Sequence, residues 1–232
     1  MEAAKRAAGL SGHRVLSTFG LINEGKGIEY VVEAMPGLVA RYPDLLYLVI
    51  GQTHPEVRKL RGEAYRNELR ALARRLGVEE HVRFVNRFLP QSELIRYLAA
   101  TDVYVTPYLS RYQITSGTLA YALGCGKAVV STPYLYAAEA LAEGRGLLAE
   151  FRNAESIGNA VDQLLGNADL RHHVEGQAAR YGQEMAWSAV AARYRELFCE
   201  VQGSRDATAA AAQSSSQVPA PVRPLAAGAP AH

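Results

Sequence analysis

The stretch VRFVNRFLPQSELIRYLAATDVYVTPY, residues 82–108, indicates the fold of this chain. Residues 82–88 are rich in β-branched and aromatic side chains, which predicts a strand. Residues 91–101 have helical spacing, with Ser92 as the expected N-cap, and residues 102–108 predict a second strand. A strand, a helix and a strand within roughly 30 residues predict a βαβ unit, whose two strands run parallel.

The same alternation extends in both directions, from about residue 13 to residue 151. Six short, mostly apolar strands are predicted, with helices between them. This pattern predicts an α/β fold with a doubly wound, parallel six-stranded sheet and right-handed crossovers. The predicted strands are residues 14–20, 45–51, 82–88, 102–108, 127–132 and 146–151, and the first helices are residues 27–43 and 55–76.

The chain divides into three regions by pattern and composition. We expect residues 1–12 to be an N-terminal remnant or linker, and residues 13–202 to form one Rossmann-like domain with helices at its C-terminal end. Residues 203–232 are rich in Ala, Pro and Ser, a composition that cannot supply a packed core. We therefore expect a disordered tail there.

Composition excludes several classes of function. Hydrophobic residues make up 49% of the chain and charged residues 21%, as in ordinary soluble domains. The net charge of +2 gives no broad electrostatic case for nucleic acid. Cys125 and Cys199 are too few and too far apart for a disulfide framework or a zinc site, and no metal motif is present. No signal-peptide core or transmembrane segment is recognisable, which predicts a cytoplasmic protein.

In a doubly wound sheet, ligands bind at the loops that follow the carboxyl ends of the strands. The first such loop contains Gly20, then Gly25 and Lys26 at the start of a helix. Glycines let the backbone approach a ligand closely, and a helix N-terminus beside a lysine suits a phosphate. The alternative is an ordinary turn with a solvated lysine.

The next two loops are less specific. Gly51 and Thr53 precede Pro55, which is expected at the first position of a helix. His54 between them is expected to be a cap or a surface residue rather than a catalyst. Arg87 is either a bidentate clamp for an anion or a surface group.

The loop before residue 117 has consecutive small residues, Ser116, Gly117 and Thr118, at a predicted helix start. Their backbone N–H groups are free to bind an anion, and the hydroxyls add donors and acceptors. The same residues also suit a capped helix packed on the sheet. The two interpretations are compatible.

Several stretches, in their order, resemble the C-terminal, nucleotide-sugar-binding half of the GT-B glycosyltransferases, specifically group 1 (family 4). The resemblance runs from about residue 15 to residue 198. It implies a nucleoside diphosphate sugar as donor, transfer with retention to an acceptor, and no cofactor. The stretches are FGLINEGKGIEYVVEAM, LLYLVIG, HVRFVNRFLPQSELIRYLAATDVYVTPY, SGTLAYALGCGKAVVSTPY and EALAEGRGLLAEF.

The family's residues can be carried over position by position. Its lysine that neutralises the donor diphosphate matches Lys26, whereas Leu21 replaces its arginine. Its two glutamates, which support the reacting sugar and the donor ribose, fall on Gln113 and Tyr121. The resemblance therefore names Lys26 and Gln113 as catalytic candidates. The donor-binding candidates are Gly20, Gly25, Gly51, Thr53, Arg87, Ser116, Gly117, Thr118 and Tyr121.

Only about a dozen residues precede the first predicted strand, so the family's N-terminal acceptor domain is not expected in this chain. The function expected is the donor-binding half of a glycosyltransferase, incomplete without that domain. The alternative is a non-catalytic nucleotide-sugar-binding module or a subunit that completes a partner chain. A separate N-terminal-domain chain or a homo-oligomer would be the partner. An apolar stripe on the last helix, including Trp187, Tyr194 and Phe198, is expected to be exposed.

Overall fold

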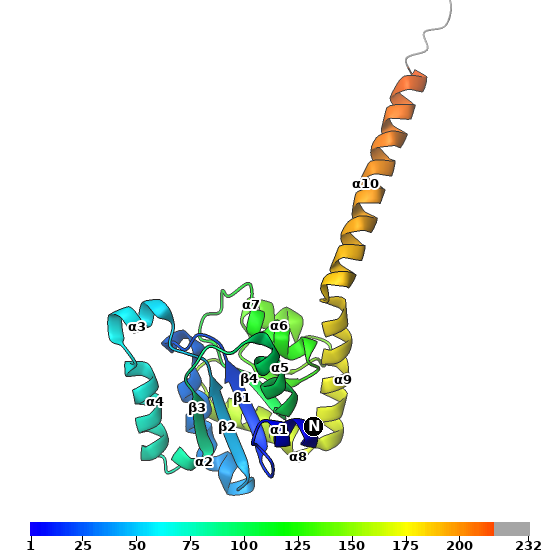
Figure 1. The fold of residues 1–232 in the computed structure, drawn as a ribbon. Helices are drawn as coiled ribbons and strands as arrows, with labels where there is room; N and C mark the ends of the chain where they lie inside the picture. Colours follow the sequence, from blue (N-terminus) through cyan, green and yellow to red (C-terminus); the bar gives the residue numbers. More distant parts are fainter. Residues whose placement is uncertain (216–232) are drawn as a thin grey trace, which may run out of the picture. The chain divides into compact units, whose positions relative to one another are not determined.

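The sheet has six parallel strands, as the sequence predicted (Figure 1). A computed structural model describes residues 1–215 of the chain. The strand order is β3-β2-β1-β4-β5-β6, so the order reverses between β1 and β4. The strands are β1 (Arg14–Phe19), β2 (Leu45–Ile50), β3 (Val82–Val85), β4 (Val103–Thr106), β5 (Ala128–Ser131) and β6 (Leu147–Leu148).

Helices cover both faces of the sheet, because each strand presents apolar side chains alternately to the two sides. Helices α2, α4 and α8 pack on one face, whereas α5, α6 and α7 pack on the other. The helices of residues 1–186 are α1 (Glu2–Ala7), α2 (Ile28–Arg41), α3 (Pro55–Arg61), α4 (Ala64–Arg75), α5 (Gln91–Ala100), α6 (Gly117–Gly124), α7 (Leu135–Ala140), α8 (Ala154–Gly166) and α9 (Ala168–Glu184), with the 3-10 turns η1 (Glu24–Lys26) and η2 (Glu79–His81).

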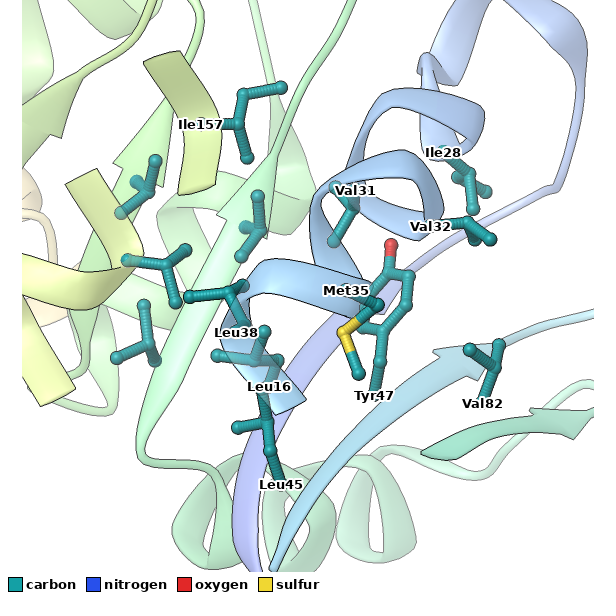
Figure 2. Packing of buried hydrophobic residues seen from close by; sticks show 14 of the residues in the cluster. Leu16, Ile28, Val31, Val32, Met35, Leu38, Leu45, Tyr47, Val82 and Ile157 are labelled. Atoms are coloured by element: carbon teal, nitrogen blue, oxygen red, sulfur yellow. The ribbon is translucent and has the colours of Figure 1, made fainter. Parts of the chain in front are cut away.

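The core on the α2 side is made of closely packed aliphatic side chains. Figure 2 shows part of it, including Val31 and Met35 of α2 and Leu16 of β1, all fully buried. Tyr47 of β2 lies in the same cluster, and its hydroxyl donates to Thr18 Oγ1 at 2.9 Å. This hydrogen bond compensates for the burial of the hydroxyl. Burial itself raises the pKa of Tyr47 above the range of an exposed tyrosine.

Two helix boundaries differ from the prediction. Residues 55–76 form two helices rather than one. The helix is interrupted at Gly62, whose φ of 60° and ψ of −130° are not helical. Helix α5 begins at Gln91 after Pro90 and has no side-chain cap, so Ser92 is not its N-cap. In contrast, Pro55 begins α3, and His54 caps it by accepting from Glu56 N.

The first residues fold onto the domain rather than forming a linker. They contain helix α1, which packs beside α5, and Leu10 is fully buried. Lys5 of α1 is buried, forms an ion pair with Asp102 at 2.7 Å and donates to His13 O at 2.8 Å. A linker was expected because only about a dozen residues precede the first strand, whereas apolar packing of Leu10 and the buried Lys5–Asp102 pair attach these residues to the domain.

The described residues divide into two units, Met1–Ala186 and a second unit that begins at Trp187. The second unit contains α10 (Trp187–Ser215), on which Trp187, Tyr194 and Phe198 are exposed, as the predicted apolar stripe requires. The predicted tail, residues 203–232, overlaps α10 up to residue 215, and its remainder lies outside the described residues. Within residues 1–215, no helix combines the length and apolarity needed to span a membrane.

Candidate functional site

The candidate site lies where the strand order reverses, between the carboxyl ends of β1 and β4. The loop after β1 leads to α2 on one face of the sheet, and the loop after β4 leads to α6 on the other. Leu109 N donates to Gly25 O at 3.0 Å, which joins the two loops. Gly27 has a φ of 62°, and a Cβ there would lie 2.1 Å from Pro107 O. Only glycine allows the two loops to approach so closely.

Lys26 belongs to the loop after β1, and its side chain contacts the loop after β4. Its Nζ is 3.8 Å from the centroid of the Tyr108 ring, and a Cβ on Gly20 would lie 3.8 Å from the same Nζ. Burial lowers the pKa of Lys26 to about 8. None of the ion pairs found in the described part of the chain involves this lysine. A partly desolvated cation without a carboxylate partner is the electrostatic situation that an anionic ligand would relieve.

The N-terminus of α6 approaches the same point. A Cβ on Gly20 would lie 3.3 Å from Thr118 Cγ2, so Thr118 and Lys26 border the same glycine. Ser116 caps the helix by accepting from Leu119 N at 3.2 Å, and Tyr108 Oη and Thr118 Oγ1 are 2.6 Å apart. The N–H groups of Gly117 and Thr118 occupy the first two helical positions, which have no acceptor within the helix. An anion could bind to these two N–H groups together with the Lys26 ammonium, and we call the three groups the anion seat.

An apolar cavity of about 420 Å³ adjoins Gly20. It contains four residues that the sequence singled out: Gly20, Gly51, Arg87 and Tyr121. The Tyr121 side chain is 40% exposed and contacts Phe19 edge-on, with 6.2 Å between the ring centroids. The other lining residues were not among the donor-binding candidates and are Phe19, Leu21, Ile50, Gln52, Phe88, Leu89, Gln91 and Leu94. The sequence analysis placed Phe88 inside a predicted strand, whereas it lies three residues past the end of β3 and is exposed.

Arg87 is already paired with a carboxylate. Its guanidinium forms two hydrogen bonds with Glu93 of α5, of which Nη1 to Oε2 measures 2.8 Å. The hydrogen bond and charge of Glu93 raise the pKa of Arg87, and Arg87 in turn lowers the pKa of Glu93. Arg87 is therefore neither a free anion clamp nor an isolated surface group in this structure.

Three other predicted residues have structural contacts. Gln113 Nε2 donates to Thr115 O at 3.0 Å within its own loop. Thr53 is only 2% exposed, and its hydroxyl donates to Glu63 at 2.6 Å rather than facing the cavity. Gly25 holds the loop after β4 through its carbonyl.

A larger hollow of about 550 Å³ lies at the amino end of β3, around Arg70 and Arg83, away from the strand ends that form the candidate site.

The fold and this crevice define a doubly wound α/β protein with its candidate ligand site at the topological switch point. More specifically, the family model of the glycosyl transferases group 1 matches residues 2–181, and the chain belongs to this family.

Relatives and solved structures agree with this assignment. The chain is 29% identical over 202 residues to a D-inositol 3-phosphate glycosyltransferase of Corynebacterium aurimucosum, an alignment that covers 86% of this chain and 46% of the relative. It is 31% identical over 208 residues to a D-inositol 3-phosphate glycosyltransferase 2 of Catenulispora acidiphila, covering 85% of this chain and 46% of the relative. The chain thus spans about half the length of the relatives that it matches.

The fold is similar to that of HepE from Anabaena in complex with UDP, with a TM-score of 0.72, 18% identity, and coverage of 88% of this chain and 52% of the other. It is also similar to the C-terminal domain of a glycosyl transferase group 1 family protein, LpcC, from Francisella tularensis. That likeness has a TM-score of 0.67 and 20% identity, and covers 78% of this chain and 89% of the other. These solved structures establish GT-B glycosyltransferases as neighbours in fold.

Proposed function

We propose that this chain binds a nucleoside diphosphate sugar and provides the donor-binding half of a family 4 sugar transferase. The observation that carries the proposal is the position of Lys26, partly buried without a carboxylate partner beside the N-terminus of α6. A diphosphate would be held by the Lys26 ammonium and by the N–H groups of Gly117 and Thr118. The HepE structure, similar in fold, is a complex with UDP, which supports this class of ligand.

The same contacts would promote transfer of the sugar. As the bond between the sugar and the diphosphate breaks, negative charge grows on the leaving diphosphate. Fixed donors that stabilise this charge more strongly in the transition state than in the ground state lower the barrier. Lys26 and the end of α6 are held by Gly27 and by the Ser116 cap, so little reorganisation is needed. This role requires no carboxylate at residue 113.

The apolar cavity is suited to the base of the nucleotide. Phe19, Phe88 and Tyr121 offer aromatic surfaces beside Gly20. A planar base can stack on such side chains, whereas a ribose diol would be held poorly by Tyr121, which has one hydroxyl. We therefore place the base in this cavity and the diphosphate on the side of Lys26.

The rest of the enzyme would come from a second domain that binds the acceptor. The relatives are about twice as long as the matched region, and water exclusion at a transfer site depends on both walls of the cleft. We propose that such a domain, in the same polypeptide or in a partner chain, closes over Lys26 and α6. Retention of configuration at the sugar is part of the same proposal.

A second candidate function is a non-catalytic nucleotide-sugar-binding module. Gln113 and the exposed Tyr121 favour it, since the first is an amide bonded to its own loop and the second is a phenol. Neither can provide a carboxylate to the sugar. Binding of the donor without release of nucleoside diphosphate would support the module, whereas slow release through hydrolysis would support the transferase.

Calorimetric titration of the chain with UDP-, GDP- and ADP-sugars tests donor binding. We expect one of them to bind, and Lys26→Met to weaken that binding about 10- to 100-fold, because a charge-assisted hydrogen bond contributes about 1.5–3 kcal/mol. Lys59→Met is the matched control, since Lys59 is exposed on α3 and paired with Glu56. The proposal is wrong if no donor binds, or if Lys26→Met and Lys59→Met bind equally well.

A further inference from the structure

We infer that Glu63 and Arg66 are positioning residues for the donor pocket, acting through the loop that follows β2. This inference rests on the proposed function, since it concerns the same pocket. Neither side chain lines the cavity. Both lie at the start of α4, three residues apart, behind the segment of residues 51–53.

Arg66 is a fully buried charge whose contacts converge on that segment. Its Nη2 donates to Gly51 O at 2.9 Å and to Thr53 Oγ1 at 3.3 Å, and its Nε donates to Glu63 Oε2 at 2.9 Å. Thr53 Oγ1 donates to the same Glu63 oxygen at 2.6 Å. These bonds form a closed ring around the turn, and the Thr53 hydrogen bond is the main cause that lowers the pKa of Glu63.

Gly51 packs directly against Gly20, which borders the anion seat. Gly51 has a φ of 132°, and a Cβ there would lie 1.9 Å from Gly20 O. Gly20 in turn borders Lys26 and Thr118. The two loops are also paired, since Ile22 N donates to Gln52 O and His54 N donates to Ile22 O, both at 2.9 Å. A shift of the loop after β2 would therefore displace the loop that carries Lys26.

A second set of contacts joins the same helices to the Lys26 loop. Arg61, at the end of α3, pairs with Glu24 of η1, and Tyr65 of α4 donates to Glu29 in the first turn of α2. Lys26 lies between these two acidic residues in the chain. The segment from α3 to α4 thus holds both walls of the crevice from behind.

The helix break at Gly62 makes this arrangement possible. Its left-handed φ ends α3 and starts α4 in a new direction, so that Glu63 and Arg66 face residues 51–53. Arg66 Nη1 has no hydrogen-bond partner within the described residues. Apolar packing would stabilise a buried position at lower cost than an incompletely bonded guanidinium. A geometric role explains why an arginine stands there.

Matched arginine-to-lysine variants on α4 test the inference. Arg66→Lys keeps the charge but loses the forked geometry, whereas Arg70→Lys makes the same change one turn away at an exposed position. Thr53→Val removes the hydroxyl, and Thr53→Ser restores it. Dissociation constants for UDP and GDP would be measured by calorimetry, the apo melting temperature by scanning calorimetry, and amide hydrogen exchange in residues 20–27 and 51–54 by mass spectrometry.

We expect Arg66→Lys to weaken binding of the nucleoside diphosphate about tenfold and to accelerate exchange in both loops, with Arg70→Lys unchanged. Thr53→Val should also weaken binding, and Thr53→Ser should restore it. Wild-type affinity in Arg66→Lys and Thr53→Val would overturn the inference. If the wild type binds neither nucleotide, the proposed function is in doubt, and loop exchange decides the positioning role: equal exchange in Arg66→Lys and Arg70→Lys would overturn it. If Arg66→Lys fails to fold, the pair at Thr53 gives the same decision.

Discussion

Buried charges at the two ends of the parallel strands differ in whether they have a partner. At the amino ends, Lys5 and Asp102 are both almost fully buried and lie 2.7 Å apart, and Asp102 also accepts from Val15 N at 2.7 Å. At the carboxyl ends, Lys26 is partly buried beside Tyr108, and no carboxylate pairs with it in the described residues.

This difference separates a charge that is neutralised within the fold from a charge that has no carboxylate partner in the described residues. The Lys5–Asp102 pair is complete within the protein, so its removal should affect folding. Lys26 lacks a counter-charge, so burial disfavours its charged form and lowers its pKa to about 8. Binding of an anion would offset the free-energy cost of burying the charged lysine.

The largest effect is expected from Asp102→Ala. The variant leaves the Lys5 ammonium without its counter-charge and Val15 N without its acceptor, and loss of one partner from a buried ion pair costs about 3–5 kcal/mol. Chemical denaturation should show this fall in the free energy of unfolding. Glu33→Ala, an exposed position on α2, is the control and should change stability by less than about 0.5 kcal/mol. Equal stabilities of the two variants would show that the Lys5–Asp102 pair does not stabilise the fold.

The pH dependence of donor binding should report Lys26. A diphosphate favours the protonated lysine, and the pKa of about 8 means that the free protein loses this proton as the pH rises through 8. Affinity for UDP or GDP should be nearly constant from pH 7 to 8 and then fall by up to about tenfold per pH unit. Lys26→Arg, which stays charged, should abolish this fall. A fall that persists unchanged in Lys26→Arg would assign it to another group.

The smallest effect is expected from Ser116→Ala. Loss of the N-cap of α6 should lower the free energy of unfolding by about 1 kcal/mol and weaken nucleotide binding slightly, because the helix end becomes less well ordered. Thr115→Ala, at the exposed neighbouring position, is the matched control. Thermal unfolding with and without UDP measures both effects. Identical behaviour of the two variants would show that the cap does not order the anion seat.

Much of the fold was predictable from local pattern. Each of the six predicted strands contains an observed one, because buried parallel strands are short apolar runs ended by glycine or polar residues. The errors occurred where local signals compete. Gly62 interrupts an otherwise helical pattern, and the attachment of α1 includes the Lys5–Asp102 pair, a contact across 97 residues that no local window contains.

The candidate site was predictable in part, for the same reason. Loop position and small residues identified Gly20, Lys26 and Ser116, since these follow strands or begin helices. The partners of polar side chains were not predictable. Arg87 has Glu93 and Thr53 has Glu63, and the aromatic wall from Phe19, Phe88 and Tyr121 comes from three separate segments.

By itself, the sequence determined the order of strands and helices, the glycines at the strand ends and the lysine at the start of a helix. Periodicity and backbone preference act over a few residues, so these features can be read locally. Only the tertiary structure decided which charges are compensated. Lys5 meets a carboxylate that lies 97 residues away in the chain, whereas Lys26 is placed beside the N-terminus of α6 without one. That difference in surroundings puts SGTLAYALGCG, residues 116–126, at the border of the candidate site as well as in a packed helix.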